Sequence, residues 1–97
     1  MKKILLACNG GFSTSILVQK IEEAATIQGV EIMVDAVPET DVEDYQDWDI
    51  LLLGPQIGHR VEEFSETMPM PVFVVDSYDY GTMNGESVLK FALENCK

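Results

Sequence analysis

Cys8 is the residue whose type and surroundings point most directly to chemistry. It follows a short apolar run at residues 4–7 and precedes Asn9, Gly10, Gly11 and Phe12, then Ser13, Thr14 and Ser15. The apolar run predicts a buried strand, the Asn-Gly-Gly turn tolerates positive φ, and the three hydroxyl residues are helix N-cap types. A thiol at such a strand–loop–helix junction faces backbone N–H groups that stabilise anions. We therefore expect Cys8 to form a stabilised thiolate, and the loop to hold a phosphate bound to or carried by it.

The competing interpretation of Cys8 is a small buried hydrophobe, which is the commoner role of a cysteine. The flanking glycines and hydroxyl residues favour chemistry, because a structural cysteine has no need of exposed backbone amides. Cys96 is interpreted as an incidental thiol near the chain's C-terminal end. Two cysteines at opposite ends of the chain, with a single His, match no disulfide framework and no zinc spacing. No metal and no cofactor are therefore predicted.

The composition predicts one globular domain spanning residues 1–97, because 46% of the residues are hydrophobic. The net charge of -11 argues against nucleic acid and anionic membrane surfaces as partners, and leaves a protein partner open. Reduced thiols fit the cytoplasm. The apolar run before Cys8 is too short for an export signal, and no run is long enough to span a bilayer.

Short apolar runs predict strands, and apolar residues at helical spacing predict helices; the two kinds of element follow one another along the chain. We expect strands at residues 4–7, 30–37, 50–53 and 72–75, and helices at residues 13–28, 57–66 and 85–95. The acidic segment 39–49 is predicted to be a solvated connection with a short helix, which Tyr45 and Trp48 pin to the core. Residues 76–84 are predicted to form a long polar loop, with Asn84 capping the last helix.

This alternation indicates an α/β fold with a parallel sheet covered by helices on both faces. Ligands of such sheets bind beyond the carboxyl ends of the strands, at the topological switch point. Three segments emerge at that edge, namely residues 8–15, 54–60 and 76–85. We expect them to form a rim around Cys8.

The residues at this rim also resemble those of a known family. The matching features are the strand ending in Cys8, Gly-Phe-Ser-Thr-Ser at 11–15, Gly-Pro-Gln at 54–56, Asp76 with Tyr80-Gly81, and Asn84-Gly85. Together they resemble the IIB component of the bacterial sugar phosphotransferase system, lactose/cellobiose (N,N'-diacetylchitobiose) class, over essentially the whole chain. The resemblance implies the sheet order 2-1-3-4 and a likeness to the small tyrosine phosphatase fold.

The resemblance further implies a phosphoryl carrier. In this family a phosphohistidine on the IIA protein donates to the cysteine thiolate, and the phosphocysteine donates to a sugar carried by the membrane IIC component. Cys8 matches the phosphorylated cysteine, and the segment from Asn9 to Ser15 matches the phosphate-cradling loop. The implied sugar is of the cellobiose/β-glucoside or lactose type.

The chain departs from the family pattern at Gly58-His59-Arg60, where more apolar or aromatic residues are typical. We interpret this difference as bearing on partner or sugar preference rather than on the thiol. His59 is predicted to be a solvated rim residue. Arg60 is predicted either to assist docking or to pair with a local Glu.

Two other classes of function remain open from the residues alone. A low-molecular-weight tyrosine phosphatase-like hydrolase shares this layout, but it needs an Arg six positions after the cysteine, where this chain has Thr14. Asp79 lies where such enzymes keep an acid, and we interpret it as a surface loop carboxylate. A non-catalytic anion-binding regulatory module is the other alternative. A phosphotransfer assay separates the three.

Overall fold

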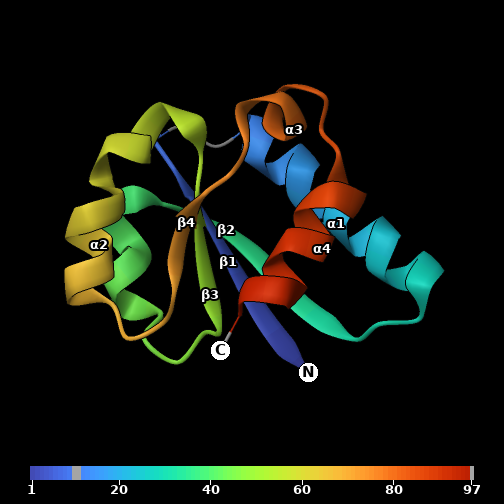
Figure 1. The fold of residues 1–97 in the computed structure, drawn as a ribbon, viewed down its shortest axis with the longest axis horizontal. Helices are drawn as coiled ribbons and strands as arrows, with labels where there is room; N and C mark the ends of the chain where they lie inside the picture. The colour runs from blue at the N-terminus through green and yellow to red at the C-terminus, as the bar shows by residue number, and fades with distance from the viewer. Residues whose placement is uncertain (10–11, 97) are drawn as a thin grey trace.

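The computed structural model describes residues 1–9 and 12–96 and places a parallel sheet between two layers of helices (Figure 1). The strands are β1 (Lys2–Cys8), β2 (Ile32–Pro38), β3 (Ile50–Leu53) and β4 (Val72–Val74). They form a four-stranded sheet of order β2-β1-β3-β4, with every neighbouring pair parallel. The α/β class and the sheet order 2-1-3-4 are therefore confirmed.

The burial of each strand follows its place in the sheet. All four residues of the interior strand β3 are completely buried, as a continuously apolar run in a covered parallel sheet should be. The edge strand β2 alternates between buried and exposed positions. It begins two residues later than predicted, because the Val30 N–H still donates to Ala25 O at 2.9 Å and Gly29 ends the helix with φ +70°.

One face of the sheet is covered by α1 (Phe12–Gln28), α3 (Ser77–Gly81) and α4 (Gly85–Asn95). Leu17 and Ile21 of α1, like Leu89 of α4, are fully buried in the core on this side. Gly85 lets α4 approach α1 closely, because a Cβ at Gly85 would stand 2.3 Å from the carbonyl carbon of Lys20. The start of α4 therefore rests directly on the backbone of α1.

The opposite face is covered by η1 (Glu39–Asp44), η2 (Pro55–Arg60) and α2 (Val61–Thr67), where η marks a 3-10 helix. Trp48 and Phe64 are buried in this second core, and Tyr45 packs edge-on against Trp48 as a predicted anchor of the acidic segment. The single helix predicted at 57–66 is wrong in its first part. A 3-10 segment comes first, and Ile57 interrupts it with a non-helical backbone because its side chain turns into the core.

The prediction of a loop throughout residues 76–84 is also wrong, because α3 lies within it. Asp76 Oδ1 accepts hydrogen bonds from the N–H groups of Tyr78 and Asp79 and so caps the helix. Asp79 Oδ2 accepts a further bond from the Ser87 hydroxyl at 2.8 Å. A helix of five residues is too short to show an apolar period, which is why its composition resembles that of a loop. Asn84 caps α4 as predicted, accepting from Ser87 N–H at 3.0 Å.

Candidate functional site

Cys8 is the last residue of β1 and lies at the switch point of the sheet. β2 lies on one side of β1 and β3 lies on the other. The connections that lead to these two strands therefore run in opposite directions across the sheet, away from the end of β1. Cys8 pairs in register with Pro38 of β2. On its other side, Gly54 N–H donates to Ala7 O at 2.9 Å. Cys8 thus lies between the last residue of β2 and Gly54, which follows β3, and it is only 4% exposed.

The predicted phosphate loop joins Cys8 to the start of α1. Asn9 is exposed directly after the strand, whereas Gly10 and Gly11 lie outside the described residues. α1 begins at Phe12, so Ser13, Thr14 and Ser15 lie inside its first turn rather than at its cap. The first N–H groups of a helix have no partner within that helix. Those of α1 lie at the same edge of the sheet as Cys8.

A buried pair of hydroxyl groups ties the first turn of α1 to α3. Thr14 is 1% exposed, and its Oγ1 lies 3.3 Å from the hydroxyl oxygen of Tyr80, which is itself buried. A buried hydroxyl needs a hydrogen-bond partner, so this pair fixes the position of the turn. Tyr80 thus contacts the first turn of α1, which the sequence analysis did not predict. Its place in the Tyr-Gly signature was the available signal.

Arg60 bridges two carboxylates at the same end of the sheet. Its guanidinium donates to Glu39 Oε1 at 2.7 Å and to Glu63 Oε2 at 2.6 Å, and it lies 4.4 Å from the ring centre of Phe64. The hydrogen bond with Glu63, followed by that with Glu39, raises the pKa of Arg60 above its ordinary value. The same hydrogen bond lowers the pKa of Glu63. The predicted pairing of Arg60 with a local Glu is therefore confirmed, and its predicted role in docking stays a prediction. The ion pair with Glu39, which joins η2 to η1, was not predicted.

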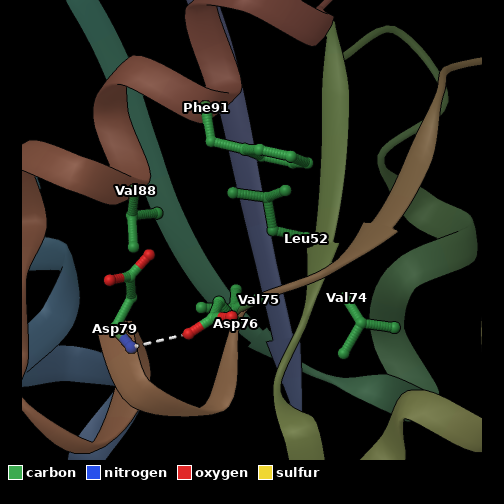
Figure 2. Close-up of a pocket in the computed structure, with 7 residues that line it drawn as sticks. All are labelled: Leu52, Val74, Val75, Asp76, Asp79, Val88 and Phe91. Carbon is green, nitrogen blue, oxygen red and sulfur yellow. Dashed lines mark hydrogen bonds between the residues drawn. The ribbon is translucent and has the colours of Figure 1, made fainter.

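A hollow of about 250 Å³ opens between β4 and α4 (Figure 2). Its walls are mostly apolar, and the carboxylates of Asp76 and Asp79 lie at its rim. Two carboxylates repel a phosphate, so this hollow is a poor anion site. Asp79 also belongs to a helix and is held by Ser87, which corrects its prediction as a loop carboxylate. The hollow is lined by Leu52, Val74, Val75, Asp76, Asp79, Val88 and Phe91.

The arrangement around Cys8 suits reversible bonding of a phosphoryl group to sulfur. It offers a thiol and the start of a long helix at the same edge of the sheet, which together favour an anion. Within residues 1–9 and 12–96, no group of three or more His, Cys, Asp or Glu side chains is arranged to hold a metal ion. None of the helices in that part of the chain is both long and apolar enough to cross a bilayer.

A sheet of this order, with a thiol at the end of its first strand and a helix beginning just beyond, defines an α/β protein of the low-molecular-weight phosphatase-like fold. The lactose-specific IIB domain of Streptococcus pneumoniae shares this fold with a TM-score of 0.85, at 21% identity over 97% of this chain and 96% of that one. The solution structure of the cellobiose-specific IIB protein of Borrelia burgdorferi gives a TM-score of 0.82 at 39% identity, over 97% of this chain and 90% of that one.

Sequence comparison identifies the family. The model of the PTS system, lactose/cellobiose-specific IIB subunit, matches residues 3–91. The oligo-beta-mannoside-specific EIIB component of Bacillus subtilis is 38% identical over 96% of this chain and 94% of its own length. The galactose-specific EIIB component of Lactococcus lactis is 36% identical over 94% and 93%. The chain belongs to the lactose/cellobiose-specific IIB family, whose members are phosphotransferases that act as phosphoryl carriers in sugar uptake.

Proposed function

We propose that Cys8 accepts a phosphoryl group from a phosphohistidine on a IIA protein and passes it to a sugar bound by a membrane IIC component. The proposed sugar is of the cellobiose/β-glucoside or lactose type, and the proposed compartment is the cytoplasm. Names of the relatives support this range, since they include cellobiose, galactose and oligo-beta-mannoside specificities. Direct transfer requires both reacting groups to meet, so the surface that docks each partner must include Cys8.

The observation that carries the proposal is the placement of Cys8 at the switch point, four residues before the start of α1 at Phe12. Helix N-termini bind phosphate through backbone N–H groups and through the dipole of the helix. The same groups favour the thiolate before transfer and the phosphate after it. The predicted loop from Asn9 to Ser15 is the segment that would surround that phosphate.

Two displacement steps complete the proposed cycle. In the first, the Cys8 thiolate donates an electron pair to phosphorus, an S–P bond forms, and the N–P bond breaks with its pair left on the histidine nitrogen. In the second, a sugar hydroxyl oxygen bonds to phosphorus while the S–P pair returns to sulfur. The hydroxyl proton leaves to solvent or to a base. Such transfers depend mainly on positioning and charge stabilisation.

Features beside the loop support a carrier rather than a hydrolase. Thr14 stands where a tyrosine phosphatase keeps its Arg, and its buried hydroxyl pairs with Tyr80. Asp79, the candidate acid, accepts a hydrogen bond from Ser87. A hydrolase needs a group that activates water for attack on the phosphocysteine. A carrier benefits from lacking that group, because its phosphocysteine must survive until the next acceptor arrives.

The test compares two reactions of the same protein. Supplied with phosphorylated IIA, the chain should take up one labile phosphate and discharge it when IIC and sugar are added. With p-nitrophenyl phosphate or a phosphotyrosine peptide, it should give no appreciable turnover. Robust hydrolysis that disappears in Cys8→Ser would replace the carrier with a phosphatase. Phosphate binding without uptake from IIA would favour a regulatory module.

A further inference from the structure

The Gly-Pro-Gln segment places a second polar side chain beside Cys8. Ala7 and Leu53 are partners in the sheet, so Gly54 follows alongside Cys8 on the next strand. A Cβ built on Gly54 would stand 3.6 Å from Cys8 Cβ and only 3.1 Å from Gln56 Oε1. The carboxamide of Gln56 therefore occupies the space that a side chain at Gly54 would fill. This space lies on the same side of the sheet as the Cys8 side chain.

This carboxamide is available for a ligand. Gln56 is exposed, and its side chain makes no hydrogen bond to the residues that the structure describes. An amide group carries two N–H donors as well as its oxygen. Half a turn about the last side-chain torsion brings those donors to the point next to Gly54. A phosphoryl group bonded to the Cys8 sulfur would extend toward this point and come within hydrogen-bond distance of the Gln56 N–H donors.

The backbone that carries Gln56 is held firmly on both sides. Pro55 fixes φ at the start of η2. The N–H of Ile57 donates to Gly54 O at 3.0 Å, and the side chain of Ile57 is only 1% exposed. At the far end, Arg60 joins η2 to Glu39 across the end of the sheet. Groups that stabilise a transition state work best when their support is rigid.

We propose that Gln56 contacts the transferring phosphoryl group, with its side-chain N–H donating to a non-bridging phosphate oxygen as the S–P bond forms and breaks. The inference rests on the proposed function of Cys8. Arg60 is the only Arg of the chain and is engaged by two carboxylates, so a neutral donor supplies this contact. A neutral donor stabilises the passing charge without trapping the phosphate as a fixed cation would.

The first experiment measures single-turnover phosphate transfer from phosphorylated IIA to wild type, Gln56→Leu and Gln56→Glu. Loss of a hydrogen bond to a charged group predicts that transfer is roughly ten-fold to a hundred-fold slower in Gln56→Leu. Gln56→Glu keeps the shape but adds like charge, so it should be slower still. The matched control is Gln28→Leu, at the exposed end of α1 farthest from Cys8. Its transfer rate should match that of wild type.

The second experiment follows side-chain amide signals by ¹⁵N–¹H NMR during phosphorylation of the wild-type protein. The Gln56 signals should shift on phosphorylation and those of Gln28 should not. Wild-type transfer rates in both Gln56 variants, or unmoved Gln56 signals, overturn the inference. If the wild-type protein takes up no phosphate on Cys8, the proposed function fails. If it is phosphorylated on Cys8 but the Gln56 signals do not move, only the inference about Gln56 fails.

Discussion

Replacing Gly85 with Ala should destabilise the whole fold, because α4 begins in direct contact with the backbone of α1. The added Cβ would stand 2.3 Å from the carbonyl carbon of Lys20, 2.4 Å from its oxygen and 2.6 Å from the nitrogen of Ile21. These atoms belong to a helix backbone, so no side-chain rotation relieves the overlap. One of the two helices must move.

The cost follows from two opposing effects. Overpacking of a well-filled core costs about 1–3 kcal/mol, and rigid backbone neighbours place this site at the upper end. Ala recovers roughly 0.5–1 kcal/mol of helix preference over Gly. A net loss of about 2 kcal/mol corresponds, for a chain of this size, to a melting temperature lower by roughly 8–16 °C.

Thermal and urea unfolding followed by circular dichroism measure this loss. Gly81→Ala in α3 is the matched control, because a Cβ there meets nothing within 4 Å and the φ is not positive. It should leave stability unchanged or raise it by about 0.4–1 kcal/mol. A Gly85→Ala protein that melts within about 2 °C of wild type would refute the packing described for α1 and α4.

Two further changes probe the contacts around the site. Tyr80→Phe removes the hydroxyl that pairs with Thr14, so urea unfolding should show a loss of about 1–2 kcal/mol, whereas Tyr78→Phe at an exposed position should show none. Arg60 lowers the pKa of Glu63 below its ordinary value of 4.5, so the pair stabilises fully above that pH and its contribution is lost as the pH falls further. Melting temperatures of Glu63→Gln and wild type should therefore converge toward acid pH; a constant difference would contradict the assigned ion pair.

Much of the fold was readable from local pattern. Residues 50–53 form a continuously apolar run that is typical of an interior parallel strand, and the capping chemistry of Asn84 predicted the start of α4. The sheet order was predicted from the family resemblance, because the residues of a strand do not indicate which strands will be its neighbours. The edge position of β2 agreed with its alternating burial.

The errors have physical causes. α3 was missed because a five-residue helix is stabilised by its Asp76 cap and by Ser87, not by an apolar face. The start of α2 was misjudged because Ile57 turns inward through a non-helical backbone, which the helical period does not encode.

For the site, the position of Cys8 at the end of the first strand could be predicted, and so could the edge of the sheet at which it lies. The long-range partners of site residues could not be predicted, because they meet only once the sheet has formed. These pairs are Thr14 with Tyr80 and Arg60 with Glu39. The place of Gln56 beside Cys8 likewise depends on the pairing of β1 with β3.

The most direct test of the central claim is to locate the phosphate. Wild type, Cys8→Ser and Cys96→Ser are incubated with phosphorylated IIA and analysed by intact-protein and peptide mass spectrometry at a pH that preserves thiophosphate. We predict one phosphate on wild type and on Cys96→Ser, assigned to Cys8, and none on Cys8→Ser. Equal uptake by Cys8→Ser, or phosphate assigned to another residue of wild type, would contradict the carrier role of Cys8.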